Sequence, residues 1–113
     1  MITIHLLRSK RGFRGYEISG HADTAPHGED VVCAAVSVLA FYIANTFREV
    51  CKITEFQALD IEEGHFLLEV SEENLHENQW DNVQVLLQGL LKNAEQLAQQ
   101  YPDAVTVFRR EVE

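Results

Sequence analysis

The feature that most constrains this chain is an apolar run at residues 31–44, which only Ser37 interrupts. The run predicts a helix from Asp30 to about Glu49 that is hydrophobic nearly all round. Such a helix has to be covered on more than one side. The run is shorter than the roughly 20 residues that cross a bilayer, so we expect a core helix and no membrane partner.

The rest of the chain predicts five strands and a second helix. We expect strands at residues 2–6, 16–19, 53–61, 65–70 and 104–108, with the first two joined as a hairpin. A second helix at residues 79–101 carries one apolar stripe, formed by Val83, Leu86, Leu87, Leu90, Ala94, Leu97, Ala98 and Tyr101. The order ββαββαβ in one domain of residues 1–113 indicates a two-layer α+β fold, with two helices on a mostly antiparallel sheet. A second subunit is the natural cover for the first helix, so we expect a homodimer.

Composition narrows the function. The net charge of −9 argues against a nucleic-acid-binding surface, which needs clustered Lys and Arg. An acidic surface keeps a protein soluble and can also attract a basic partner. The N-terminus lacks a basic leader before an apolar stretch, so we expect a cytoplasmic protein. Cys33 and Cys51 would lie about 27 Å apart along one helix, so both should be free thiols.

The surroundings of Cys33 are those of a possible nucleophile. Cys33 follows Asp30, a favourable N-cap residue, and falls in the first turn of the expected helix. Free N–H groups and the helix dipole favour a thiolate there, and can also hold the oxyanion of a tetrahedral intermediate. His21 follows the second expected strand, whose end beside the helix start would bring imidazole and thiol together. Gly20 indicates close backbone approach or an unusual dihedral, and Ser37 lies one turn beyond Cys33 on the same face.

The same residues also fit purely structural roles. A cysteine in an apolar helix is usually a small buried side chain, and a histidine at a strand end is more often structural or exposed. Asp30 can be only a cap, and Ser37 only a small helical residue. Residue types and spacings alone therefore leave both interpretations open.

Two segments resemble a known signature. The sequences GHA at residues 20–22 and GEDVVCAAVS at residues 28–37 resemble the motif of the ribosomal-processing cysteine protease family, often called Prp. The resemblance covers nearly the whole chain in length and element order, but its specificity lies in residues 20–37. It implies a Cys–His dyad in which Cys33 is the nucleophile, while His21 accepts its proton and later protonates the leaving amine. Gly20, Asp30 and Ser37 match the other motif positions.

The resemblance also implies a substrate. Members of the family remove a short N-terminal extension from ribosomal protein twenty-seven of the large subunit, which otherwise blocks a functional site on the ribosome. They form homodimers through their helices, and we expect no cofactor or metal. The expected activity is therefore that of a cysteine endopeptidase in ribosome maturation, and the expected partner is a basic ribosomal protein that carries an extension.

Two other functions remain open. The residue types of His21, His27, Glu29, Asp30 and Cys33 suit a zinc-dependent hydrolase, although their spacing matches none of the common zinc patterns. His27 is not required by the family. The net charge equally suits a non-enzymatic dimeric module that binds a basic ribosomal protein during ribosome assembly.

Substrate contacts can be assigned from the same segment. The loop from Ala22 to Gly28, shaped by Pro26 and Gly28, is a candidate lid that has to move before an extended peptide reaches Cys33. We expect an apolar groove beside Cys33 for the residues before the scissile bond. Lysines after the bond should meet acidic residues, with Glu29 nearest and then Glu62 and Glu63.

Overall fold

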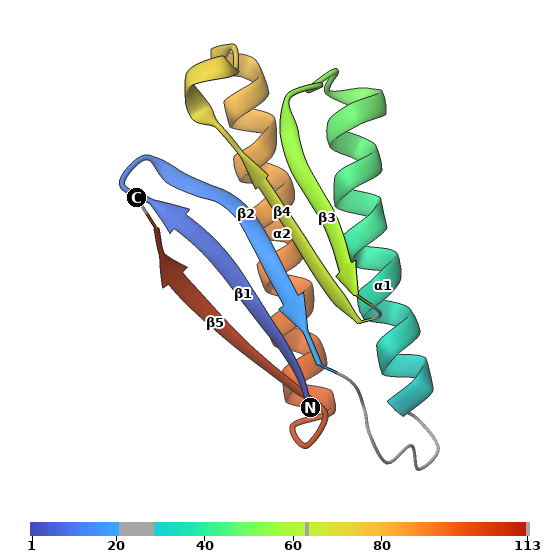
Figure 1. The fold of residues 1–113 in the computed structure, drawn as a ribbon. Coiled ribbons are helices and arrows are strands. Elements are labelled where there is room, and N and C mark those ends of the chain that lie inside the picture. The colour runs from blue at the N-terminus through green and yellow to red at the C-terminus, as the bar shows by residue number, and fades with distance from the viewer. Residues whose placement is uncertain (21–28, 63, 113) are drawn as a thin grey trace.

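The computed structural model of the 113-residue chain describes residues 1–20, 29–62 and 64–112, and only the backbone of residues 29, 30 and 57–62. Its elements in chain order are β1 (Ile2–Ser9), β2 (Gly12–Ser19), α1 (Glu29–Asn45), a π-helical turn (Thr46–Val50), β3 (Phe56–Glu62), β4 (His65–Val70), a 3-10 turn (Glu72–Asn74), α2 (Glu77–Gln100) and β5 (Val105–Glu111). Strands and main helices follow the predicted order ββαββαβ (Figure 1).

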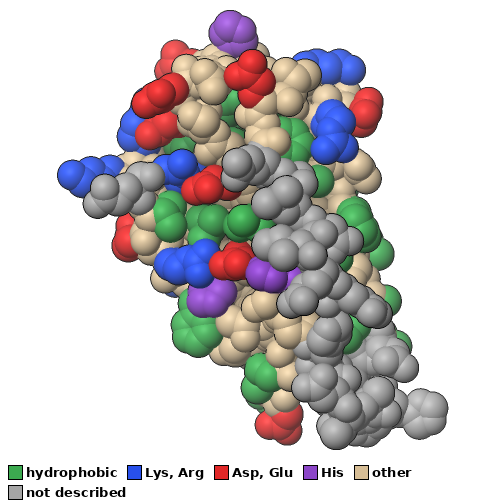
Figure 2. All heavy atoms as spheres, viewed as in Figure 1, with side chains coloured by type: hydrophobic (Ala, Val, Ile, Leu, Met, Phe, Trp, Pro, Cys, Tyr) green, Lys and Arg blue, Asp and Glu red, His purple; other side chains and the backbone are tan. Residues whose placement is uncertain are grey.

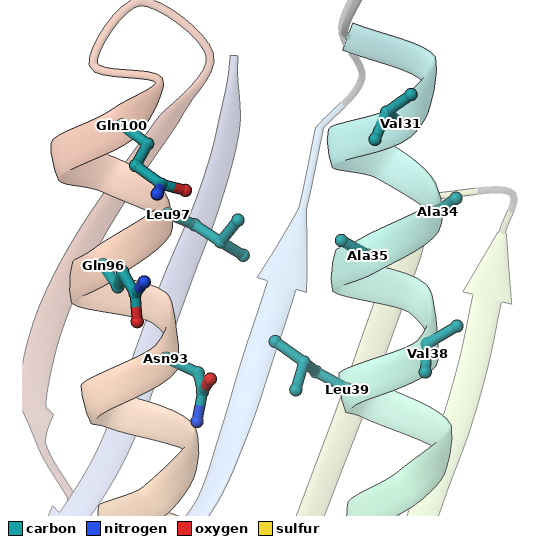
Figure 3. Close-up of a pocket in the computed structure, with 9 residues that line it drawn as sticks. All are labelled: Val31, Ala34, Ala35, Val38, Leu39, Asn93, Gln96, Leu97 and Gln100. Atoms are coloured by element: carbon teal, nitrogen blue, oxygen red, sulfur yellow. The ribbon is translucent and has the colours of Figure 1, made fainter.

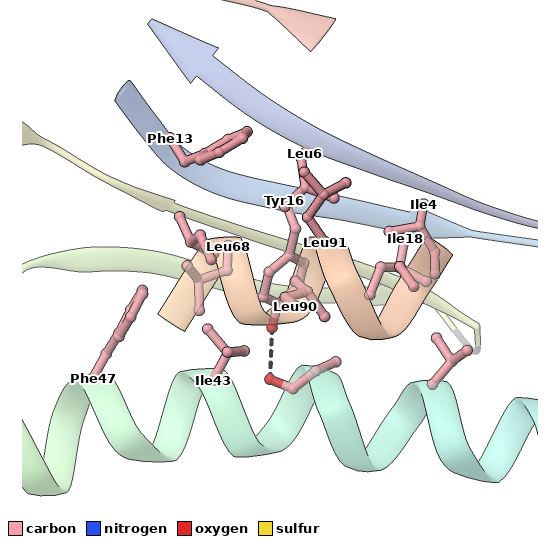
Figure 4. Close-up of a cluster of buried hydrophobic side chains, with 14 of the residues drawn as sticks. Ile4, Leu6, Phe13, Tyr16, Ile18, Ile43, Phe47, Leu68, Leu90 and Leu91 are labelled. Atoms are coloured by element: carbon pink, nitrogen blue, oxygen red, sulfur yellow. Dashed lines mark hydrogen bonds between the residues drawn. The ribbon is translucent and has the colours of Figure 1, made fainter. Parts of the chain in front are cut away.

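The strands form one sheet in the order β3-β4-β2-β1-β5. The β1–β2, β2–β4 and β3–β4 pairs are antiparallel, and the β1–β5 pair is parallel. Both helices lie on the same face of this sheet (Figures 1 and 4). The predicted α+β fold, with one helical layer on a mostly antiparallel sheet, is therefore confirmed.

The first hairpin is tighter than the sequence predicts, because β2 begins at Gly12 and not at Tyr16. Phe13 is buried, and Gln84 of α2 holds its backbone at both polar groups. The Phe13 N–H donates to Gln84 Oε1 at 2.8 Å, and the Phe13 carbonyl accepts from Gln84 Nε2 at 2.7 Å. These two hydrogen bonds extend β2 into residues 12–15, a segment whose glycines are typical of a loop.

The strand after α1 begins later than predicted, at Phe56 and not at Ile53. Lys52 has a φ of 57°, which turns the chain sharply after the helical segment. Ile53 is buried, and its N–H donates to the Phe47 carbonyl at 2.9 Å. Ile53 is therefore apolar because it seals the core at this turn, and not because it belongs to a strand.

The core lies between the helices and one face of the sheet (Figure 4). The hydroxyl of Tyr16 on β2 donates to the Ala40 carbonyl of α1 at 2.7 Å, which ties the two layers together. Burial raises the pKa of Tyr16 well above its ordinary value, so this hydroxyl stays protonated as a donor. The buried residues of α2 are Trp80, Val83, Leu87, Leu90, Leu91 and Ala94.

The apolar stripe of α2 is largely as predicted, with Leu86, Leu97 and Ala98 partly buried beside the core. Tyr101 is an exception, because it lies past the end of the helix and is 39% exposed. A stripe that follows the helical period stops where the helix stops.

The apolar side chains of α1 fall into a buried set and an exposed set. Val36, Ala40 and Ile43 all face the sheet and are buried together with Val32 and Phe47. Leu39, by contrast, is only partly buried and points toward α2. The apolar side chains left outside are a different set: Val31, Val38, Phe41 and Tyr42 are all more than half exposed.

The helical segment is also longer than its apolar run. Residues Val31–Val50 form 20 residues of helix with a mean hydropathy of 1.6, because the π-helical turn continues α1. By length and composition alone this helix could cross a membrane, although the apolar run of residues 31–44 within it is shorter than a span. The core helix of a soluble protein passes the same test, and α1 buries one face on the sheet.

Candidate active site

Gly20 directly follows β2 in a conformation that suits glycine. Its φ is +101°, in the region that side chains avoid, and a Cβ atom there would overlap the carbonyl oxygen of Met1. Both features inferred from the sequence, the unusual dihedral and the close backbone approach, are confirmed. They fix the direction in which the chain leaves the sheet immediately before residue 21.

The start of α1 lies slightly earlier than an Asp30 cap requires. The helix begins at Glu29, so Asp30 belongs to the first turn, where its acidic type suits the positive end of the dipole. Cys33 then opens the second turn, and its own N–H falls within the hydrogen-bonded part of the helix. The Cα–Cβ bonds of helical residues tilt toward the N-terminus, which places the Cβ atom of Cys33 on the side of the first turn.

Cys33 lies on the boundary between core and solvent. Its side chain is partly buried and packs against the core, as does Ala44 further along α1. Ser37 and Phe41 follow Cys33 at spacings of four and eight residues, so the three share one side of the helix. We call this side, formed by Cys33, Ser37 and Phe41, the cysteine flank of α1.

The remaining predicted site residues fall largely outside the described residues. These are His21, Ala22, Pro26, His27 and Gly28, and the side chains of Glu29, Asp30, Glu62 and Glu63 also lie outside them. The distance between Cys33 and His21, the lid and the acidic contacts therefore stay predictions. Figure 1 shows that β2 ends and α1 begins at the same end of the molecule, which is the arrangement that a dyad of these two residues requires.

Cys51 differs from Cys33 in position and surroundings. It follows the π-helical turn at the far end of the same continuous helix, about 27 Å from Cys33. Both cysteines are free, as predicted. Burial raises the pKa of the Cys51 thiol, which disfavours its thiolate. Cys51 is therefore a poor candidate for the nucleophile.

Metal ligation has little support in the part of the chain that is described. No group of three or more His, Cys, Asp or Glu side chains that could hold a metal ion occurs there. Four of the five residues suggested as zinc ligands have side chains outside that part.

An apolar groove of about 530 Å³ runs along α1 and α2 (Figure 3). Ala35 and Leu39 point toward α2, and Leu97 of α2 points back toward them. The groove is lined by Val31, Ala34, Ala35, Val38, Leu39, Asn93, Gln96, Leu97 and Gln100. Cys33 does not line it, since Ala35 lies about 160° around the helix axis from Cys33. The expectation of an apolar groove beside Cys33 is therefore not met by this one, which belongs to the opposite side of α1.

The face of the sheet away from the helices carries a charged cluster that sequence reasoning missed (Figure 2). Glu17 accepts hydrogen bonds from His65 Nε2 at 2.8 Å and from Arg110 Nη2 at 2.7 Å. Both partners lower the pKa of Glu17 below its ordinary value, and the hydrogen bond with His65 has the largest effect. Beside them His5 stacks on Phe108 with ring centroids 5.4 Å apart. Because α1 lies on the opposite face of the sheet, this cluster is separate from Cys33. Only the register of four strands could have revealed it.

Comparison with known proteins assigns the chain to a family. The family model described as "Cysteine protease Prp" matches residues 1–106. The ribosomal processing cysteine protease Prp of Bacillus subtilis (strain 168) is 33% identical over 111 residues, which cover 95% of this chain and 96% of that protein.

Solved structures agree with this assignment. The crystal structure of SMU.848 from Streptococcus mutans has a TM-score of 0.79 and 29% identity, with 99% of each chain covered. The protease Prp of S. aureus, crystallised with a substrate peptide, shares the fold with a TM-score of 0.76 at 23% identity, over 97% of this chain and all of that one. Sequence match, fold and the cysteine at the start of α1 lead to one conclusion: the chain is a cysteine protease and belongs to the Prp family.

Proposed function

We propose that this protease removes the N-terminal extension of ribosomal protein twenty-seven of the large subunit, with Cys33 as nucleophile and His21 as its acid–base partner. The observation that supports it best is the position of Cys33, partly exposed at the boundary of the core and close to the start of α1. Membership of the Prp family and the similarity to a ribosomal processing cysteine protease of B. subtilis support the substrate class.

The proposed chemistry is acyl transfer in two halves. The Cys33 thiol gives its proton to His21, and the thiolate attacks the scissile carbonyl carbon. The oxyanion that forms would be stabilised by the N–H groups and dipole at the start of α1. His21 then protonates the leaving amine as the C–N bond breaks, which leaves a thioester on Cys33. Water attacks the thioester, its proton passes through His21, and the carboxylate product leaves as the thiol is restored.

A direct test is mass spectrometry of an extended basic ribosomal protein incubated with the enzyme. Wild type should yield two fragments whose summed mass equals that of the substrate plus one water. Binding of the substrate without cleavage would favour the assembly module. Loss of activity to EDTA but not to iodoacetamide would favour a zinc-dependent hydrolase.

We also propose that the protein is a cytoplasmic homodimer held by the outer side of α1. Val31, Val38 and Tyr42 form one stripe there, at spacings of seven and four residues, and each is more than half exposed. A monomer would leave this stripe and the adjoining groove exposed to water. Soluble monomeric proteins seldom expose large apolar patches. The stripe lies on the opposite side of α1 from Cys33, so a partner could cover it without blocking the nucleophile.

A further inference from the structure

The hydroxyl of Tyr16 is a directional link between α1 and the sheet. Its bond to the Ala40 carbonyl, at 2.7 Å, is the one hydrogen bond between α1 and a strand in the part of the chain that the structure describes (Figure 4). Both residues are buried, and the other contacts of α1 with the core, through residues such as Val32 and Ile43, are apolar. Apolar contacts have no preferred direction, whereas a hydrogen bond holds its partners to a narrow range of distance and angle. The Tyr16 hydroxyl therefore fixes where α1 lies along β2.

The two partners of this bond belong to the two elements that lead to the candidate active site. Ala40 lies seven residues after Cys33 on α1, which is about 10 Å along the helix axis and about 20° around it. Tyr16 lies four residues before Gly20, which is about 13 Å along the strand. Because β2 ends and α1 begins at the same end of the molecule, Cys33 and Gly20 both lie toward that end from the bond (Figure 1). The bond therefore sets the position of the helix that carries the nucleophile relative to the strand that leads to residue 21.

We propose that Tyr16 is a positioning residue, whose hydroxyl holds α1 in register with β2 and so keeps the Cys33 thiol within reach of the acid–base group that follows Gly20. The inference rests on the proposed function, in which that group is His21. A thiol and its base have to lie within hydrogen-bond distance, and a displacement of about 1 Å can cost up to about 10²-fold in rate. The bond lies about two helical turns from Cys33, so Tyr16 acts through the position of α1 and not by contact with the substrate.

Phenylalanine at position 16 separates this role from packing. It would fill nearly the same space in the core, and the Ala40 carbonyl lies inside α1, where it keeps its intrahelical partner. Tyr16→Phe therefore removes the directional link without leaving a buried polar group unpaired. The loss of one hydrogen bond should lower the melting temperature by about 4–8 °C.

The test measures turnover and thiol reactivity separately. For cleavage of an extended basic ribosomal protein, Tyr16→Phe should lower kcat about tenfold and leave KM nearly unchanged, because only the alignment of the reacting groups is disturbed. Iodoacetamide at neutral pH should label Cys33 severalfold more slowly, because a base that is out of reach no longer takes up the thiol proton. Peptide mapping separates the labelling of Cys33 from that of Cys51.

A fold that is merely loosened would give a different pattern. Loosening exposes the partly buried Cys33 thiol and therefore speeds its labelling, whereas loss of the base slows it. Tyr16→Met, a second variant that lacks the hydroxyl but fills the core with a flexible apolar side chain, should show the same loss of kcat and the same slower labelling.

Gln84→Met provides the matched control. Gln84 joins α2 to the start of β2 through two hydrogen bonds to Phe13, at the end of the strand away from Gly20. Its substitution should lower the melting temperature at least as much as Tyr16→Phe does, because it leaves the backbone groups of Phe13 without their partner. The kcat and the labelling rate of Cys33 should stay as in wild type.

Two results would overturn the inference. If folded Tyr16→Phe keeps the kcat of wild type, or labels at Cys33 as fast as wild type or faster, the hydroxyl stabilises the fold and does not position the nucleophile. If Gln84→Met loses kcat and labelling to the same extent, both losses follow stability and not the bond to α1. If wild type leaves the ribosomal protein uncleaved, the proposed function fails, and the labelling rates, which need no substrate, still decide whether Tyr16 positions Cys33.

Discussion

The two helices cover the same face of the sheet, but their outward surfaces differ in apolar content. On α2 the outward residues are mostly polar, and Val85 is the one large apolar side chain exposed in the described part of that helix. On α1 the outward residues include Val31, Val38, Phe41 and Tyr42. The fold needs one apolar face from each helix, and α2 provides no more than that. The additional apolar surface of α1 is the basis of the proposed contact with a second subunit.

The largest effect that separates the helices should come from the histidines that precede them. We expect His21→Ala to lower turnover about 10²- to 10⁴-fold with little change in substrate binding, because the leaving amine loses its proton donor. His76, at the N-terminus of α2, is the matched control, and His76→Ala should keep its activity. A His21→Ala enzyme within a few-fold of wild type in steady-state assays would remove the dyad from the mechanism.

A second large difference should appear in self-association. Val38 on α1 and Val85 on α2 are 65% and 68% exposed in one chain. Val38→Glu should convert a dimer to a monomer, because it places a charge in an apolar interface, whereas Val85→Glu should leave the dimer intact. Light scattering at micromolar concentration measures both. A monodisperse wild-type monomer would contradict the proposed interface outright.

A smaller effect concerns the acidic residues placed by sequence near the start of α1, of which Glu29 is the nearest to Cys33. Charge attraction between exposed groups is screened beyond about 8 Å at physiological salt and mainly speeds association. We expect kcat/KM for a lysine-bearing peptide to fall severalfold as salt rises, with kcat nearly flat. A peptide with glutamine in place of lysine should respond little. Equal salt responses of the two peptides would leave the acidic charge a role in solubility alone.

The smallest effect should come from the sheet face that neither helix covers. Glu17 is held ionised by His65 and Arg110, so its lowered pKa stabilises the fold above the ordinary glutamate pKa of 4.5 and ceases to do so as pH falls through the lowered value. Glu17→Gln should cost about 0.5–1 kcal/mol of unfolding free energy at pH 7, as a partly exposed pair does. In urea titrations this difference should shrink below pH 4.5. A difference that is independent of pH would mean that the charge of Glu17 does not stabilise the fold.

Elements whose apolar residues recur at a regular spacing could be predicted from the sequence. Boundaries and faces that depend on tertiary contacts could not. The stripe of α2 and the alternation of β1 gave the fold class, because each pattern follows the period of its own element. The early start of β2 depends on Gln84, which is far away in sequence. Which residues of α1 face the sheet could not be read from a run that is apolar all round.

The candidate site divides in the same way. Cys33 and the special backbone of Gly20 were found from residue type and position, since a helix start and a positive φ depend on local sequence. The exposed position of Phe41 at the edge of the helical layer was not predicted. Its contact with Phe66 of β4 depends on how α1 lies against the sheet, which no local pattern encodes.

The most direct test of the central claim compares the two cysteines at opposite ends of the α1 segment. Cys33→Ser and Cys51→Ser are made as matched variants and incubated with an extended basic ribosomal protein, and the products are weighed by mass spectrometry. We expect Cys33→Ser to release no fragment, while Cys51→Ser cleaves at the rate of wild type and at the same bond. Cleavage by Cys33→Ser, or a folded Cys51→Ser variant that cleaves nothing, would contradict the assignment of Cys33 as the nucleophile.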